Sequence, residues 1–128
     1  MTATAFRCRA CGVAVTIRLE ELTDPEQLEE RDAQPHVPRG RYVVSDGSFF
    51  TGSEGAYLVH LEDTIHTQHH HDHGRLNGCC GLDGCDGPNT LCANGHEVGT
   101  EKSDCWMPHA LLLSAEAVEP TRTTSSET

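Results

Sequence analysis

The chain has 128 residues, of which 36% are hydrophobic and 5% aromatic, so it has room for one domain with a modest apolar core. Its 20 acidic residues outnumber its 9 lysines and arginines and give a formal net charge of -11 at pH 7. This charge excludes nucleic acids and anionic membranes as natural ligands, because both are bound by clustered Lys and Arg side chains.

Seven cysteines are available to compensate for the small core, either as disulfides or as metal ligands. An odd number leaves at least one thiol outside any disulfide. The first residues lack the apolar stretch of a secretion signal, and no segment has the ~20 apolar residues of a membrane span. We therefore expect a cytoplasmic protein whose thiols stay reduced and bind metal.

The N-terminal third of the chain predicts one strand and one short helix. Residues 13–19 alternate apolar and polar side chains, which is the pattern of a half-buried strand. Residues 23–31 begin with a capping box and carry a proline near the first helical position. This segment predicts one or two exposed helical turns.

The middle of the chain predicts the centre of a sheet. Residues 41–44 and 48–50 flank an Asp-Gly dipeptide at 46–47, which is typical of a hairpin turn. Residues 56–61 are the most apolar stretch in this region, so we expect a small antiparallel sheet centred on them. His60 in this strand is predicted to be a core residue and not a metal ligand.

The second half of the chain changes in composition. Residues 77–94 are rich in Gly, Cys, Asn and Asp and need something other than an apolar core to order them, for which metal is the simplest candidate. Residues 97–101 predict a short strand, and residues 110–118 are apolar enough to close the sheet. The predicted fold is α+β, a small antiparallel sheet with little helix, as one domain over residues 1–119 followed by a disordered polar tail at 120–128.

Two short segments have the composition of metal-binding turns. Residues 8–12 form a Cys-x-x-Cys-Gly unit, and residues 92–96 form a Cys-Ala-Asn-Gly-His unit in which imidazole takes the place of a thiolate. Together they resemble the paired knuckles of zinc-ribbon proteins, although a long insertion separates them and only a minor part of the chain is covered. Carried over residue by residue, the resemblance implies a structural zinc ion bound by Cys8, Cys11, Cys92 and His96.

Four cysteines remain, and four thiolates are enough for a second closed tetrahedral site. They are Cys79, Cys80, Cys85 and Cys105. Adjacent cysteines point apart in extended backbone, so Cys79 and Cys80 share one ion only if the neighbouring glycines allow a turn. Alternatively, one of the two serves the first site, is replaced by a histidine or is simply buried.

Residues 74–89 together with residues 103–106 are similar to a motif of small bacterial proteins of uncharacterised function. The resemblance names no activity, but it implies that this block acts as one unit. Asp86 and Asn89 are then expected to cap turns, and Trp106 to shield a bound metal from water.

Five histidines lie within eight positions and suit ions that prefer imidazole, such as zinc, nickel or copper. They are His66, His69, His70, His71 and His73. Residues 68–73 also resemble the His-x-His-x-Asp-His signature of metallo-β-lactamase-fold hydrolases, with Gln68 in place of the first histidine. A chain of this length has no room for the layers of that fold. An exchangeable metal site and a role in supporting the cysteine sites are therefore both open for these histidines.

Sites closed by four protein ligands leave no position for substrate, so the sequence favours a structural zinc protein that acts as a binding or scaffold module, with another protein as partner. Metal storage or delivery through the histidine-rich segment is the alternative. A zinc-dependent hydrolase ranks third, because no nucleophile and base grouping is recognisable. An iron–sulfur or redox protein is a further alternative for a Cys-rich chain.

Overall fold

A computed structural model describes residues 2–124 of the chain. These residues form nine strands in two sheets and three single-turn 3-10 helices, and no α-helix is present among them. The strands are β1 (Thr2–Cys8), β2 (Glu20–Glu21), β3 (Arg41–Val44), β4 (Tyr57–Val59), β5 (Thr67–His69), β6 (Thr90–Cys92), β7 (Glu97–Lys102), β8 (Ala110–Leu113) and β9 (Val118–Thr124). The 3-10 helices are Pro25–Gln27, Leu61–Asp63 and His73–Arg75. None of them has the length or the apolar character to span a membrane.

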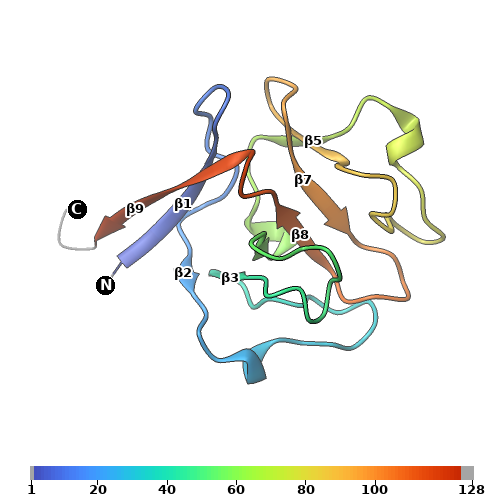
Figure 1. Cartoon of the computed structure of the whole chain (residues 1–128), viewed down its shortest axis with the longest axis horizontal. Helices are drawn as coiled ribbons and strands as arrows, with labels where there is room; N and C mark the ends of the chain where they lie inside the picture. The colour runs from blue at the N-terminus through green and yellow to red at the C-terminus, as the bar shows by residue number, and fades with distance from the viewer. Residues whose placement is uncertain (1, 125–128) are drawn as a thin grey trace.

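The two sheets differ in size, and the first and last strands of the chain both belong to the smaller one. The larger has the order β2-β3-β4-β8-β7-β6-β5 and is antiparallel except for its β2–β3 pair. The smaller is an antiparallel ribbon of β1 and β9, which extends to one side of the larger sheet and pairs Thr2 with Thr124 at its outer end (Figure 1). The fold is therefore nearly all β, and the α component of the predicted α+β class is wrong.

The predicted helix over residues 23–31 shortens to the 3-10 turn Pro25–Gln27. Its first turn is capped as expected, because the Asp24 carboxylate accepts a hydrogen bond from the backbone N–H of Glu26 at 3.0 Å. None of the three helical residues is buried. A longer helix has no apolar face to pack here, and short helices without tertiary packing are marginal in water.

The hairpin predicted around residues 46–47 does not form. Strand β3 pairs instead with β4, with Val43 opposite Leu58. The chain between them loops back through hydrogen bonds from Ser45 N to Ala56 O (2.8 Å) and is not extended at residues 48–50. Phe50 in this loop is buried, so burying its ring in the core outweighs the local Asp-Gly turn signal.

Other predicted strands are present with shifted bounds. Residues 56–61 contain β4, residues 97–101 lie in β7 and residues 110–118 contain β8. His60 is buried, as predicted, and its Nδ1 accepts a hydrogen bond from the Glu62 N–H at 3.0 Å. The predicted tail from residue 120 starts as strand, because β9 runs to Thr124; residues 125–128 lie outside the described residues.

Residues 13–19 connect the two sheets instead of forming a regular strand. Isolated bridges join Ala14 and Leu19 to β1, and Thr16 bridges to Thr64 beside the larger sheet. The expected alternation is kept only in part, because Val15 and Leu19 are buried and Ile17 is exposed.

The main core lies where the ribbon meets the larger sheet. Phe6 of β1 is fully buried, and its ring centroid lies 4.5 Å from that of Tyr57 and 5.0 Å from that of Tyr42. Val118 of β9 and Leu113 of β8 belong to the same cluster. Apolar packing thus holds the base of the ribbon against the larger sheet, beside the residues that form the first candidate metal site.

Candidate metal centre

The first candidate site brings together residues from both sheets. Cys8 is the last residue of β1, and Cys11 lies in the turn after it. Cys92 is the last residue of β6, and His96 immediately precedes β7. All seven cysteines of the chain are free thiols, so no disulfide competes for them.

Each half of this site is a tight turn that depends on glycine. Gly12 and Gly95 have φ angles of 80° and 87°, which residues with a Cβ rarely adopt. The turns are closed by hydrogen bonds from Gly12 N to Cys8 O (2.7 Å) and from Gly95 N to Cys92 O (2.9 Å). A further bond from Cys92 N to His96 O (2.8 Å) brings the two ends of the second turn together. Each turn therefore holds its own two ligand residues close together by local backbone hydrogen bonds.

The four ligand atoms converge on one point. Those of Cys8, Cys11, Cys92 and His96 all lie within 4.8 Å of one another. Cys11 Sγ and Cys92 Sγ are 3.7 Å apart, and Cys92 Sγ is 3.4 Å from His96 Nδ1. Cys8 and Cys92 are buried, whereas Cys11 and His96 are exposed. This cluster is able to bind a metal ion at the rim of the core.

Asn94 supports the thiolate form of this cluster and was not singled out by the sequence analysis. Its backbone N–H donates to Cys92 Sγ at 3.4 Å, and its side-chain Nδ2 donates to Cys11 Sγ at 3.3 Å. The Asn94 donor is the main cause that lowers the pKa of Cys11 from 9.0 to about 6. Burial has the opposite effect on Cys8 and raises its pKa. The only signal in the sequence was an amide residue placed between two expected ligands.

The second candidate site contains three cysteines. The Sγ atoms of Cys79, Cys80 and Cys105 lie within 4.8 Å of one another, and all three residues are exposed. Residues 74–89 and 103–106 therefore lie together, as predicted, because Cys79 and Cys80 contact Cys105. Unlike the first site, this group stands on loops and faces solvent.

Asp104 organises this second group. Its Oδ2 accepts a hydrogen bond from the backbone N–H of Cys79 at 2.9 Å, and its Oδ1 accepts one from that of Cys80 at 2.9 Å. The N–H of Cys105 also donates to Oδ1 (2.7 Å), and the indole N–H of Trp106 donates to Oδ2 (2.9 Å). These four donors, led by the backbone N–H groups of Cys80 and Cys79, hold the pKa of Asp104 far below its usual range.

The thiols of this group affect one another strongly. A hydrogen bond to the Cys80 sulfur is the largest cause that raises the pKa of Cys105 to about 12, and the same neighbour raises the pKa of Cys79. Nearby negative charge of Cys80 and Asp104 adds to both shifts. Ionising all three thiols without a cation is therefore unfavourable.

Cys85 lies outside both groups. Its Sγ is 3.7 Å from the carbonyl oxygen of Asp83, and its backbone N–H donates to the carboxylate of that residue at 2.9 Å. Asp86 accepts a hydrogen bond from the Asn77 side chain at 2.8 Å, in keeping with its expected role in a turn. Asn89 is buried and bonds β7, where Glu101 N donates to its Oδ1 at 2.6 Å.

Trp106 does not cover the second group. It is 56% exposed, and its only described hydrogen bond is the one to Asp104. It is one of the residues that line a pocket of about 450 Å³, together with Phe49, Glu30 and Asp32. The predicted shielding of metal by this side chain is therefore incomplete.

The histidine run extends from the residue before β5 to the start of the 3-10 helix His73–Arg75, and none of its members belongs to either ligand group among the described residues. His69 and His70 contact the carboxylates of Glu101 (3.1 Å) and Glu97 (2.9 Å) instead. The ring of His71 is 3.1 Å from the side-chain oxygen of Gln68. The remaining members His66 and His73 are exposed, and His66 Nδ1 lies 3.0 Å from Ala14 O.

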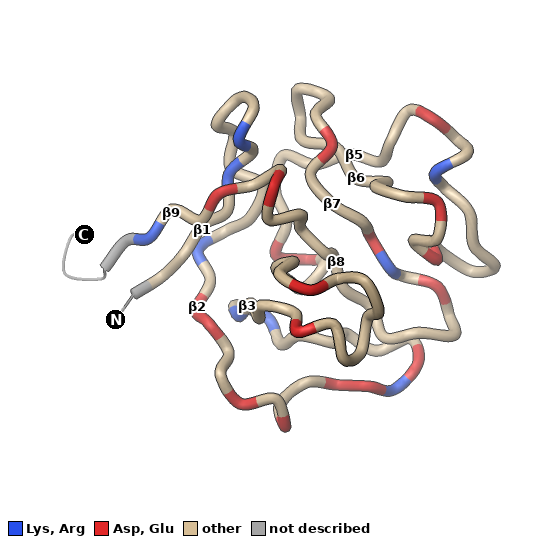
Figure 2. The backbone as a smooth tube through the Cα atoms, in the orientation of Figure 1, with Lys and Arg blue, Asp and Glu red and all other residues tan. Residues whose placement is uncertain are grey.

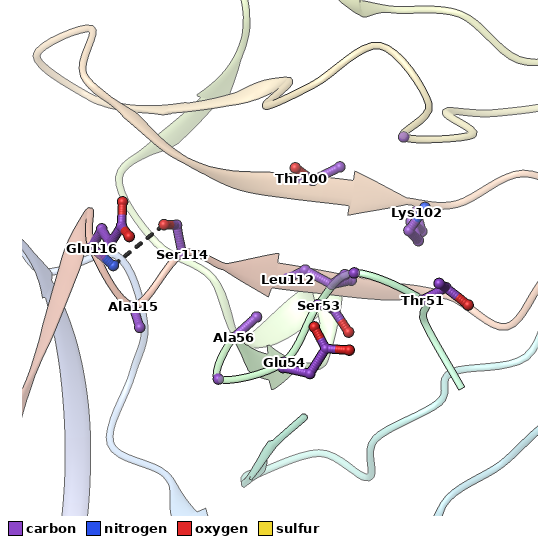
Figure 3. A pocket seen from close by; sticks show the side chains of 13 residues that line it. Thr51, Ser53, Glu54, Ala56, Thr100, Lys102, Leu112, Ser114, Ala115 and Glu116 are labelled. Atoms are coloured by element: carbon purple, nitrogen blue, oxygen red, sulfur yellow. Dashed lines mark hydrogen bonds between the residues drawn. The ribbon is translucent and has the colours of Figure 1, made fainter. Parts of the chain in front are cut away.

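A separate cavity of about 340 Å³ lies over β7 and β8 and contains no ligand group (Figure 3). Its charged lining residues are Glu54, Lys102 and Glu116. The view shows the backbone N–H of Glu116 donating to Ser114 Oγ, a contact of 3.3 Å. Nothing in this lining gathers a nucleophile with a base.

Comparisons of the chain with protein-family models, with curated proteins and with solved structures found no match. The chain is a small, mostly β protein with a Cys/His cluster able to bind a metal.

Proposed function

We propose that this protein is a zinc-stabilised binding module, in which one structural zinc ion joins the two sheets and the surface beside the second cysteine group binds a basic protein partner. The observation that carries the proposal is the convergence of Cys8, Cys11, Cys92 and His96 within 4.8 Å. Three sulfurs and one imidazole nitrogen are a donor set found at structural zinc sites.

The distances support zinc in this position. With Zn–S bonds of about 2.3 Å, two thiolates on a tetrahedral ion are about 3.8 Å apart. Cys11 Sγ and Cys92 Sγ are 3.7 Å apart, so little movement is needed to bind the ion. Four protein ligands leave no open position for water or substrate, which favours a structural role over catalysis.

The metal content tests the first half of the proposal. Native mass spectrometry of the full chain should find one zinc ion at the first site, and a chelator should remove this ion only as the join between the two sheets is lost. Cys11→Ser should lose this ion and lower the free energy of unfolding by about 3 kcal/mol or more, which corresponds to a Tm lower by ~10 °C.

Cys85→Ser is the matched control, because Cys85 is also exposed but lies outside both ligand groups. It should keep the ion of the first site and the Tm of the parent chain. A Cys11→Ser protein that melts with the parent would contradict the structural role.

The surface around Trp106 supports a basic partner. Trp106 (56% exposed) and Phe49 (40% exposed) line one pocket with the acidic residues Glu30 and Asp32. Lys102 already lies over the ring of Phe50 in the same pocket, with its Nζ 5.9 Å from the ring centroid. Aromatic faces beside carboxylates attract Lys and Arg side chains.

The charge of the whole chain points the same way. Figure 2 shows Asp and Glu distributed along many loops, with few Lys and Arg between them. A net charge of -11 would speed association with a basic partner and repel an acidic one.

Fluorescence tests the second half of the proposal, since Trp106 is the only tryptophan of the chain. A synthetic Lys- and Arg-rich peptide should change this emission at low salt, and added salt should weaken the effect. The double variant Glu30→Gln/Asp32→Asn should bind on the order of fivefold more weakly.

The control removes the same charge from the other cavity, in the double variant Glu54→Gln/Glu116→Gln. It should bind the peptide nearly as the parent does. Equal weakening in both double variants, or an equal response to an acidic peptide, would overturn the assignment of this surface.

A further inference from the structure

The group of Cys79, Cys80 and Cys105 offers three ligand atoms, whereas the first site offers four. Three sulfur atoms converge within 4.8 Å, and no fourth Cys, His, Asp or Glu ligand atom joins them among residues 2–124. All three cysteines are exposed. The three thiols therefore form a cluster at the surface that is open to solvent on one side, called the thiol cup below.

The thiol cup is built by the backbone around it. A Cβ on Gly78 would lie 1.7 Å from Gly81 O, and a Cβ on Gly81 would lie 2.2 Å from Ser103 O. The loop is also bonded to the opposite segment, through Ser103 N to Leu82 O at 2.7 Å. Such close approach is open only to glycine, so the chain packs tightly where it carries the cysteines.

Asp104 explains how two adjacent cysteines point to the same side. Its two carboxylate oxygens accept the backbone N–H groups of Cys79 and Cys80, one each, at 2.9 Å. The dipeptide is thereby wrapped around the carboxylate, and its thiols meet that of Cys105. The same four N–H contacts occupy the carboxylate, so Asp104 is not free to act as the fourth ligand.

We propose that Cys79, Cys80 and Cys105 form a second, open zinc site, whose fourth tetrahedral position holds water that exchanges for a neutral nitrogen donor of the imidazole class. Zinc bound by three protein ligands keeps one position for an outside ligand. Three thiolates on a divalent ion leave a charge of about -1, and Asp104 adds another negative charge beside it. A neutral donor is favoured over an anion for this reason.

This inference goes beyond the structural role of the first site and does not depend on it. It also assigns Cys85 no part in binding, because its Sγ contacts the carbonyl of Asp83 instead. A histidine side chain on a bound partner is one source of the donor, and free imidazole reproduces its chemistry.

Cobalt(II) substitution tests the open position, because tetrahedral cobalt absorbs visible light and the bands change with its ligands. The full chain should bind two cobalt ions, and added imidazole should shift the absorption of one of them. Cys79→Ser and Cys105→Ser should each bind one ion and show no shift with imidazole. Both substituted residues are exposed, so the fold is expected to persist.

Cys85→Ser separates the open site from a closed four-cysteine site. The variant should still bind two cobalt ions and respond to imidazole as the parent does. Loss of one ion or of the imidazole response in Cys85→Ser would overturn the inference, as would one ion in the parent chain or a response that survives in Cys79→Ser. The ion that remains in Cys79→Ser reports on the first site separately.

Discussion

Cys11 and Cys105 are both exposed, yet their neighbours give them opposite acidities. The amide of Asn94 stabilises the Cys11 thiolate and lowers the pKa to about 6, whereas the hydrogen bond with the Cys80 sulfur, followed by desolvation and the neighbouring Asp104 carboxylate, raises the pKa of Cys105 to about 12. Exposure alone therefore does not decide which thiols are ionised near neutral pH. Single hydrogen-bond donors and like charges decide it.

These acidities predict different reactivities in the metal-free protein. At pH 7, iodoacetamide should alkylate Cys11 about a hundredfold faster than Cys105, after allowance for the weaker nucleophilicity of a more acidic thiol. Peptide mass mapping after short exposures measures both rates. Asn94→Ala should slow the reaction of Cys11, and equal rates at the two cysteines would contradict the pKa difference.

The sign of the pH dependence follows from the same shift. Because the pKa of Cys11 is lowered from 9.0, its thiolate persists in the folded chain down to about pH 6. The Cys11 thiolate contributes fully to stability above the pKa of the thiol in the unfolded chain. This contribution is lost as the pH falls through about 6, the pKa in the folded chain. The alkylation rate of Cys11 should accordingly rise with pH around 6 and then level off.

The backbones of β7 and β8 approach each other closely at one glycine of the larger sheet. Gly99 lies opposite Leu113, and a Cβ on Gly99 would be 2.5 Å from the backbone oxygen of Leu112. That oxygen belongs to a buried strand and has little freedom to move. A side chain here would push two neighbouring strands of the larger sheet apart.

Gly99→Ala should therefore lower the free energy of unfolding by about 1–3 kcal/mol, measured by urea denaturation. Gly74→Ala is the control, since the nearest atom to its Cβ is the Asp72 carboxylate oxygen at 3.2 Å. This oxygen caps the 3-10 helix through Gly74 N but lies on an exposed side chain that needs to move only slightly, so this variant should unfold close to the parent. Similar losses in both variants would argue against the close β7–β8 packing.

The whole molecule depends on the join between the ribbon and the larger sheet. Apolar packing of Phe6 against Tyr42 and Tyr57 forms one part of this join. The proposed zinc ion forms the other part, because Cys8 belongs to the ribbon and Cys92 to the larger sheet. Metal removal should therefore act on the join before it acts on the sheet centre.

Hydrogen exchange with and without a chelator measures this order. Amides of β1 and β9 and of the turn at residues 92–96 should lose protection first, while those of β4 and β8 should keep theirs longer. Equal loss in all strands would indicate that the ion stabilises the fold as one unit. Unchanged protection in β1 and β9 would contradict a metal link between the two sheets.

The sequence by itself determined the local features. The Cys-x-x-Cys-Gly and Cys-Ala-Asn-Gly-His segments predicted the first ligand group, because turn geometry and ligand spacing are fixed within five residues. The apolar stretches that became β4, β7 and β8 were also recognisable, since burial selects them whatever their partners. Asp24 caps a turn as predicted, but the residues that follow it have no apolar face, so the turn does not extend into a helix.

Only the tertiary structure decided which segments meet. It paired β3 with β4 instead of closing a hairpin at residues 46–47, and it drew β9 onto β1 across almost the full length of the chain. It also chose Cys105 over Cys85 as the neighbour of the Cys79 and Cys80 thiols and placed Asp104 beneath them. Such contacts join residues far apart in sequence, and their free energy comes from packing and hydrogen bonds that exist only once the sheets have formed.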